Sequence, residues 1–434
     1  MLWLTRRERR GTGAATGRLG ARQMRNLTAA AGALTLAVAL AACGDGGGGD
    51  ADASGGLEGE AVVIGVQSPD TGASAYPQST YGAEAAVWYV NNELGGINGA
   101  PLEMDLCSGD GTPETGVKCA NDFVAADVPV VFDAYDQVST GAMTPILKSA
   151  EIPIVGTLAG QGVAESEAYP TAFYFSGPLE TSALGMVKIL SELGKSSASL
   201  AVNDVPSSHG YVDELVKPLG EAVGVDVEAV YADVDNINYQ VLAATELSEE
   251  PDVAGVISLP EESCTGLIGA LRQNGFDGTV FAGSCSQFID ELGADAAGAI
   301  IQPRLWVPLA YDNAPAEVQE QLDDFAAAME AVGYEDEQSA RSLYSFAGIV
   351  NLANVINGID GEITNASVSE AMQGLTDFQT FLGPEVTCDG EQWPGRPGAC
   401  SHEGIFFEVQ EDGTLAPVDP DGYLDLEPES ATIG

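Results

Sequence analysis

Groups that carry positive charge are scarce in this chain. Its 434 residues include 16 Lys and Arg, 65 Asp and Glu and two His, for a formal net charge of −49. Residues 1–42 hold seven of the basic residues and one acid, Glu8, so nine basic and 64 acidic residues follow from Cys43 onward. Such a surface repels nucleic-acid phosphates and anionic headgroups, which argues against nucleic acid as a partner. The acidity is explained equally by solubility and by adaptation to high salt.

Motifs for catalysis and for cofactors are missing as well. The G-x-S-x-G turn of hydrolases is absent: its nearest counterpart, Gly283-Ser284-Cys285, lacks the second glycine, and neither His209 nor His402 has a supporting motif. The chain has no Walker loop and no dinucleotide fingerprint. With two His and no zinc-ligand spacing of cysteines, a metal site is not expected. We therefore expect neither an enzyme nor a cofactor.

The N-terminal hydrophobic run is too short to cross a membrane comfortably. It covers Leu27–Ala42, follows Arg22 and Arg25, and ends in Leu-Ala-Ala-Cys43, whereas a membrane-spanning helix needs about 20 apolar residues. Small residues before a cysteine resemble the lipobox of bacterial lipoproteins, where the thiol is lipidated and becomes the new N-terminus. We predict a signal peptide over 1–42, lipidation of Cys43 and a Gly-rich tether over 43–59. An ordinary signal peptide with an incidental cysteine is the alternative.

The leader also suggests a later start of translation. Counted from Met1 the basic region is unusually long and contains two Arg pairs, whereas counted from Met24 it has the usual form. We favour a start at Met24. With either start, the signal peptide and Cys43 predict an exported protein that is lipid-anchored to the outer face of the cytoplasmic membrane.

Six cysteines remain once Cys43 is set aside, and export places them in an oxidising compartment. They can pair in many ways. Sequential pairing closes the shortest loops and keeps each bridge local. We therefore predict the disulfides Cys107–Cys119, Cys264–Cys285 and Cys388–Cys400.

Short apolar runs alternate with amphipathic stretches along the rest of the chain. The first series predicts strands at 61–66, 102–107, 129–134 and 152–157, with helices at 78–92, at 113–126 and from about 139. A second series predicts strands at 199–204, 225–231, 253–259 and 279–284, with helices at 179–193, 210–223, 239–248 and 266–274. Helices at 316–332 and 339–357 and a strand at 404–409 follow, the last in a tail of small antiparallel pieces. Two such series predict an α/β protein with two doubly wound parallel sheets, which bind ligands beyond the carboxyl ends of their strands.

The stretch YGAEAAVWYVNNELGGINGAPL from Tyr81 onward resembles the first helix of type I periplasmic binding proteins of the leucine/isoleucine/valine family. Further similar segments follow in the same order: the Ser-Thr-Gly at 139–141, IPIVGT at 152–157, YSFAGIVNLANVI at 344–356 and the terminal GIFFEVQEDGTLAPV. The resemblance implies two α/β lobes joined by a three-stranded hinge that close on a solute. Lobe 1 would comprise 60–174 with 302–378, and lobe 2 would comprise 175–301 with 379–425.

The resemblance also implies the positions of ligand contacts in the first lobe. Ser139 and Thr140 stand where a strand gives way to a helix, so their amides and hydroxyls suit a carboxylate or another acceptor, although simple N-capping uses the same geometry. Thr157 follows the next strand and would be a second hydroxyl contact. Tyr76, in the loop after the first strand, would stack on the ligand or cover it.

The second lobe departs from the family pattern. The acid that usually holds a ligand ammonium after the strand at 279–284 is replaced by Cys285 and its serine neighbours. Glu261 or Glu262 could supply that charge from the adjacent loop, and we select Glu262, although an acid at a helix start is also ordinary. His209 stands where the family has Tyr and would donate to the ligand; a surface helix cap is the alternative.

These observations predict a substrate-binding lipoprotein of an ABC importer that captures an amino acid, an amide or a related small molecule. Its partners would be the permease subunits in the membrane and the membrane lipid held through Cys43. A ligand-sensing receptor of the same fold, acting on a membrane partner, is the alternative function.

Overall fold

The computed structural model describes residues 56–72, 75–136, 139–158 and 169–426. The predicted signal peptide, Cys43 and most of the predicted tether lie outside these ranges. Within the described part of the chain, no helix combines the length and the apolar character that a membrane crossing requires.

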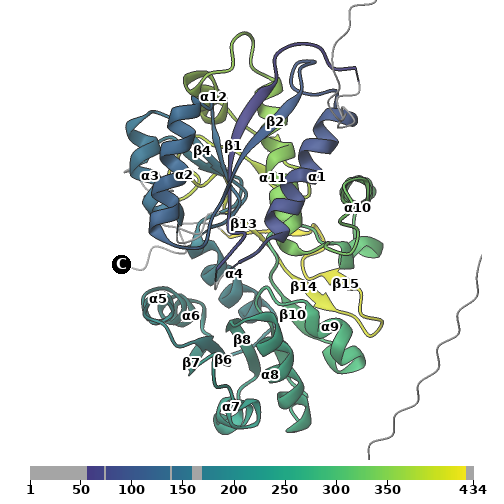
Figure 1. Cartoon of the computed structure of the whole chain (residues 1–434). Helices are drawn as coiled ribbons and strands as arrows, with labels where there is room; N and C mark the ends of the chain where they lie inside the picture. The colour runs from purple at the N-terminus through teal and green to yellow at the C-terminus, as the bar shows by residue number, and fades with distance from the viewer. Residues whose placement is uncertain (1–55, 73–74, 137–138, 159–168, 427–434) are drawn as a thin grey trace, which may run out of the picture. The chain divides into compact units, whose positions relative to one another are not determined.

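The first sheet is built from the first βα series (Figure 1). Its five parallel strands lie in the order β2-β1-β3-β4-β5. The strands are β1 (Val62–Ser68), β2 (Leu102–Ser108), β3 (Val131–Asp133), β4 (Ile154–Gly156) and β5 (Ala172–Tyr174). The helices between them are α1 (Gln78–Asn92), α2 (Pro113–Ala126) and α3 (Ser139–Ser149). This is the doubly wound arrangement that the alternation of apolar and amphipathic segments predicts.

The second sheet repeats that order and extends it. Five parallel strands lie in the order β7-β6-β8-β9-β10, and β14 and β15 add to the β10 edge in antiparallel pairing. The strands are β6 (Ser197–Asn203), β7 (Asp226–Ala232), β8 (Val253–Ser258), β9 (Thr279–Phe281), β10 (Ala299–Ile301), β14 (Phe407–Val409) and β15 (Leu415–Pro417). The α-helices of this series are α4 (Leu179–Glu192), α5 (Pro206–Tyr211), α6 (Lys217–Val223), α7 (Tyr239–Glu246), α8 (Glu261–Gln273) and α9 (Gln287–Leu292).

The remaining elements connect and cover the sheets. They are a π-helical turn (Val212–Val216), three 3₁₀ turns (Leu247–Glu249, Gly293–Ala296 and Pro308–Asn313), α10 (Ala316–Ala331), α11 (Ala340–Asn357), α12 (Asn365–Gln373), β11 (Phe378–Gln379), β12 (Glu385–Val386), β13 (Glu403–Ile405) and β16 (Tyr423–Asp425). The chain thus leaves the first sheet after β5, returns after β10 to pack α11 against α1, and re-enters the second sheet at β14. These three passages agree with the three-stranded hinge between two lobes that the resemblance implies.

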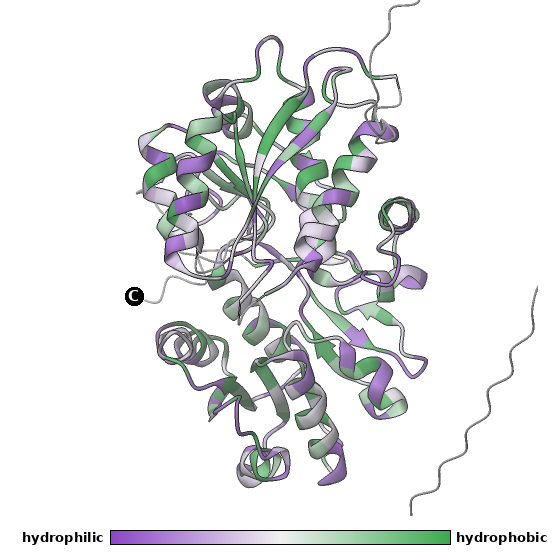
Figure 2. Cartoon of the chain, viewed as in Figure 1, coloured by the Kyte–Doolittle hydropathy of each residue, from purple (hydrophilic) through white to green (hydrophobic). Residues whose placement is uncertain are grey.

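Alternate residues of the buried strands serve separate cores, because successive side chains of a strand point to opposite faces. In β3, Phe132 belongs to the core that α1 and α11 cover, whereas Val131 belongs to the core that α2 and α3 cover. In the second sheet, Val280 and Phe281 of β9 divide in the same way between the α7–α8 side and the α4–α6 side. Figure 2 shows the resulting hydrophobic strands and the hydrophilic outer faces of the helices.

Three sequence-based boundaries were wrong. The helix predicted at 266–274 begins at Glu261, directly after Pro260, with two acids in its first turn; these are ordinary signals of a helix start. The helix predicted at 210–223 begins at Pro206 and contains a π-helical turn. The strand predicted at 404–409 is two strands divided at Phe406, and β13 pairs with β16 whereas β14 joins the second sheet.

All three predicted disulfides are present. Cys107–Cys119 joins the end of β2 to α2, and Cys264–Cys285 joins α8 to the loop that precedes α9. Cys388–Cys400 closes a loop of the tail, and the amide of Cys400 donates to the carbonyl of Tyr174 at the end of β5 (2.9 Å). The tail is therefore tied to the edge of the first sheet.

Candidate functional site

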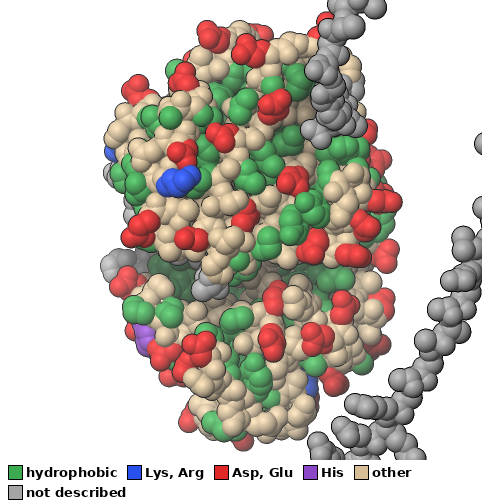
Figure 3. Space-filling model, viewed as in Figure 1, with side chains coloured by type: hydrophobic (Ala, Val, Ile, Leu, Met, Phe, Trp, Pro, Cys, Tyr) green, Lys and Arg blue, Asp and Glu red, His purple; other side chains and the backbone are tan. Residues whose placement is uncertain are grey.

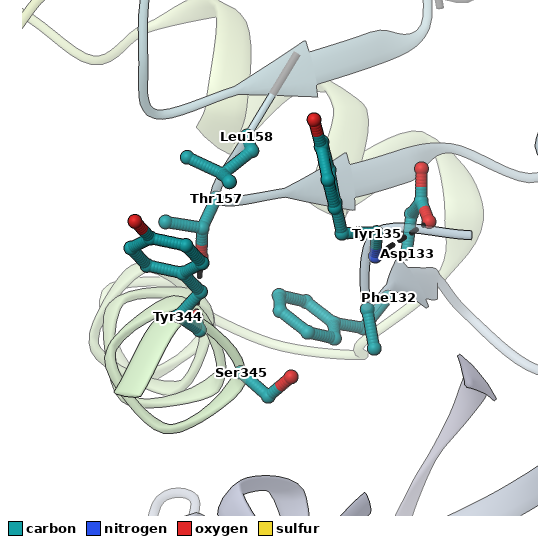
Figure 4. Close-up of a pocket in the computed structure, with 8 residues that line it drawn as sticks. Phe132, Asp133, Tyr135, Thr157, Leu158, Tyr344 and Ser345 are labelled. Atoms are coloured by element: carbon teal, nitrogen blue, oxygen red, sulfur yellow. Dashed lines mark hydrogen bonds between the residues drawn. The ribbon is translucent and has the colours of Figure 1, made fainter. Parts of the chain in front are cut away.

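The carboxyl ends of β3 and β4 and one face of α11 meet at a small cavity (Figure 4). Thr157 follows β4, and its hydroxyl donates to the backbone carbonyl of Tyr344 on α11 (2.6 Å). Tyr135 follows β3 and adopts a left-handed backbone conformation with φ of 68°. That conformation is uncommon for a residue with a side chain, and here the Tyr135 amide donates to the carboxylate of Asp133 (3.0 Å).

An arginine that the sequence analysis did not select lies beside this cavity. Arg341 is the second residue of α11, and its guanidinium carbon is 4.3 Å from the ring centroid of Tyr76 and 4.6 Å from that of Tyr135. A guanidinium over an aromatic ring is attracted by the negative charge of the ring face. Tyr76, predicted as a ligand contact, is 40% exposed and thus combines an accessible ring with a fixed cationic neighbour.

Ser139 and Thr140 are buried at the start of α3 and already have protein partners. The amide of Ser139 donates to the Asp136 carboxylate (3.0 Å), and its hydroxyl donates to the carbonyl of Thr112 (3.2 Å). The hydroxyl of Thr140 donates to the carbonyl of Asp136 (2.7 Å). These bonds fix the turn between β3 and α3, so both residues position the rim of the site through their own lobe.

A buried carboxyl group lies beneath the same turn. Asp133 accepts hydrogen bonds from the amides of Tyr135 and Asp136 and from the hydroxyl of Tyr174 (3.0, 3.2 and 3.2 Å). Burial raises the pKa of Asp133 to about 6, against the hydrogen bonds, which lower it. Its acceptor positions are occupied by these donors, which make it a support of the loop.

At the start of α8, Glu261 and Glu262 have different environments. Glu262 is exposed, whereas Glu261 is partly buried and accepts from the amides of Ser286 (3.0 Å) and Gln287 (3.2 Å) at the start of α9. Burial raises the pKa of Glu261, and the positive charge of Arg341 acts in the opposite direction. Glu261, which the sequence analysis considered and set aside, is thus an acid within electrostatic range of Arg341.

His209 lies on α5 with its side chain partly exposed. Its Nε2 atom is 2.8 Å from the Asp204 carboxylate, and its ring stacks on Tyr231 with centroids 3.8 Å apart. Two residues later, Tyr211 is partly buried and within electrostatic range of Arg304: burial raises its pKa, while the charge of Arg304 lowers it. Sequence reasoning missed Arg304 and Tyr211, and the scarcity of arginine in the chain was the signal that could have directed attention to the former.

A family model described as "Periplasmic binding protein" matches residues 61–414. The chain belongs to this family. The resemblance inferred from the helix and Gly-Gly motif at 81–99 is thereby confirmed, and members of the family are solute-binding proteins found outside the cytoplasm.

Individual relatives of this periplasmic binding protein are distant. The Leu/Ile/Val-binding protein homolog 1 of Brucella abortus (strain 2308) is 24% identical over 354 residues, which cover 79% of this chain and 90% of the relative. A leucine binding protein from Thermotoga maritima has a TM-score of 0.65 at 14% identity and covers 82% of this chain and 98% of its own. A solute binding protein of an ABC transporter from R. palustris, solved with 4-hydroxybenzoate, has a TM-score of 0.67 at 17% identity, with coverage of 86% and 100%. The two structures show the shared fold.

Proposed function

We propose that this periplasmic binding protein captures a small polar solute between its two lobes and delivers it to the membrane subunits of an ABC importer. The match of the family model to 61–414 carries this proposal. The relatives whose names mention ABC transporters and Leu/Ile/Val binding support it. No bond of the solute is broken in this function.

The structure places the proposed ligand contacts in different surroundings. Tyr76 is exposed, whereas Thr157 is buried in the wall of the small cavity with its hydroxyl bonded to Tyr344; we propose that both touch the solute. Ser139 and Thr140 would hold the rim through the bonds described above. His209 and Glu262 remain proposals for the second lobe, where both side chains are solvent-accessible. The lobe borders, 60–174 with 302–378 and 175–301 with 379–425, belong to the same proposal.

Ligand screening tests the binding function directly. The purified full-length chain should unfold at a higher temperature in the presence of its solute, by an amount that grows with solute concentration. A panel of amino acids, amides and small organic acids serves as the probe set, and mass spectrometry of the recovered solute should find it unchanged. Turnover of the solute, or a panel without any stabilising member, would contradict the proposal.

Tyr76 offers a matched pair of variants for locating the site. Tyr76→Ala should weaken binding about fivefold or more, because an aromatic surface is lost. Tyr311 is a similarly exposed tyrosine, 36% accessible, and lies in the 3₁₀ turn Pro308–Asn313. Tyr311→Ala should leave affinity unchanged, and equal losses in both variants would place the solute elsewhere.

The lipid anchor is a separate proposal that rests on the Leu-Ala-Ala-Cys43 sequence. Expression in a bacterium supplied with a labelled fatty acid should label the wild-type chain and leave Cys43→Ser unlabelled. Label on the Cys43→Ser variant, or a wild-type chain released without label, would refute the anchor without affecting the binding function.

A further inference from the structure

Four arginines occur from Cys43 onward, and two of them have evident protein partners. Arg272 donates to four backbone carbonyls, and its side chain thereby ties α8 to the loops around it. Arg396 contacts the carboxylate of Glu180 through two nitrogens, at 3.1 and 2.6 Å. The guanidinium groups of the other two, Arg304 and Arg341, have different surroundings.

Arg304 and Arg341 are both partly buried, yet neither guanidinium donates a hydrogen bond or forms an ion pair within 4.0 Å among the residues that the structure describes. This is unusual in a chain with 64 acids after residue 42, where even exposed lysines such as Lys118 contact a carboxylate. Figure 3 shows how densely carboxylates cover one face of the molecule. A half-buried guanidinium without an acceptor is costly, and an acceptor supplied by a ligand removes that cost.

The geometry of Arg341 leaves its donors available. The guanidinium carbon lies over the rings of Tyr76 and Tyr135, contacts that use the flat face of the group. The N–H donors point outward in the plane of the guanidinium, where they match the two oxygens of a carboxylate. Arg341 is thus held by aromatic rings, and no described residue accepts a hydrogen bond from its edge.

Arg304 shares the neighbourhood of Arg341. Its amide donates to the hydroxyl of Tyr344 (3.4 Å), one turn after Arg341 on α11. Burial raises the pKa of Tyr344, and the charges of Arg341 and Arg304 both lower it. Tyr211 on α5 is within range of Arg304 and of Tyr135 as well. Arg304 and Arg341 therefore lie within electrostatic range of the same tyrosine, Tyr344.

The buried and half-buried carboxylates that the structure describes around Arg341 and Arg304 already have partners, and Glu262 beside them is exposed to solvent. Asp133 accepts from two amides and a tyrosine hydroxyl, Glu261 accepts from two amides, and Glu180 is paired with Arg396. The arginines instead favour a negative charge, and the tyrosine rings favour a flat apolar body. The ammonium group of an amino acid would therefore have to pair with Glu262 in solvent, whereas a carboxylate meets two half-buried guanidinium groups.

We propose that the solute is an aromatic carboxylate, bound through its carboxyl group by Arg341 and Arg304 with its ring against Tyr76 and Tyr135. The inference rests on the proposed solute-binding function and names the class of solute. The chain's overall negative charge opposes the approach of an anion over long range, so selectivity comes from these short-range contacts.

Calorimetric titration of the full-length chain tests the charge requirement. The probes are benzoate, phenylacetate and 3-phenylpropionate, each beside its uncharged amide, together with leucine and phenylalanine. At least one acid should bind tenfold or more tightly than its amide, because a charged hydrogen bond is lost in the amide. Acids that bind no better than their amides overturn the inference.

Variants assign the binding energy to the arginines. Arg341→Gln and Arg304→Gln should each weaken acid binding by about tenfold or more, while the amide is little affected. Lys118→Gln removes the same charge from the exposed face of α2 and should change nothing. Urea unfolding of each variant shows whether it is folded, and Arg341→Lys provides a second test that retains the charge and should restore part of the affinity.

The outcomes separate the inference from the function on which it rests. Tight binding of leucine or phenylalanine with no binding of the aryl acids overturns the aromatic carboxylate and leaves the solute-binding function intact. Aryl acid binding that survives both arginine variants overturns the proposed site. Absence of binding by every probe in the broader panel overturns both proposals.

Discussion

Glu246 provides a test of the second sheet's surroundings, because it is a buried carboxyl group that forms no ion pair within the part of the chain that the structure describes. It ends α7, is 1% exposed, and accepts a hydrogen bond from the amide of Gly255 (3.1 Å). Its Oε1 atom is buried without a hydrogen-bond partner. Burial raises the pKa of Glu246 from 4.5 to about 9, against the hydrogen bonds, which lower it. The folded protein therefore holds this side chain uncharged at neutral pH.

The raised pKa makes the folded state lose stability as the pH rises. In the unfolded chain Glu246 ionises near its ordinary pKa of 4.5, whereas the folded chain retains the proton up to about pH 9. The contribution of this group is thus complete below pH 4.5 and falls by up to about 1.4 kcal/mol per pH unit above it. At about pH 7.5, the accumulated cost is about 4 kcal/mol.

Glu246→Gln tests this cost because glutamine keeps the shape of the protonated acid and never ionises. We expect the variant to be about as stable as the wild type near pH 4.5 and a few kcal/mol more stable near pH 7.5. Urea denaturation at both pH values measures the difference, and Glu249→Gln, on the exposed turn that follows, is the matched control. A stability difference independent of pH, or a destabilised Glu246→Gln at pH 7.5, would refute the reasoning.

Three further perturbations have defined outcomes. Gly82→Ala should destabilise the chain by about 1–3 kcal/mol in urea denaturation, because the added Cβ would overlap the Ser342 carbonyl oxygen in the α1–α11 contact; Gly210→Ala, which meets no neighbouring atom, should be nearly neutral. Removing Cys388–Cys400 by a double alanine substitution should lower the free energy of unfolding by about 3 kcal/mol, since the bridge closes a 12-residue separation, and an unchanged urea midpoint would disprove that role. Raising NaCl from about 0.1 M to about 1 M should increase the melting temperature. The Debye length then falls from about 10 to about 3 Å, which screens the repulsion within a chain of net charge −49. A salt-independent melting curve would show that this repulsion does not lower the stability.

Local sequence determined the elements whose signals are local. The helices Gln78–Asn92 and Pro113–Ala126 begin and end where the pattern predicts, and sequential pairing identified all three disulfides. Apolar runs in the sequence also predicted where the parallel strands lie, because a strand buried on both faces has few polar positions. The division of residues 403–409 between two sheets was not predictable, since both halves are equally apolar and only their partners distinguish them.

The site shows the same division between local and tertiary information. Hydroxyl residues after β3 and β4 were selected from the sequence because the resemblance to the family places both loops at the binding cleft. Arg341 could not be selected from the sequence, because nothing local to α11 indicates that Tyr76 and Tyr135 lie against its side chain. Sequence alone thus determined the fold, the disulfides and the acidity of this protein. Only the tertiary structure decided which cations remain without carboxylate partners, because that depends on contacts between segments far apart in the chain.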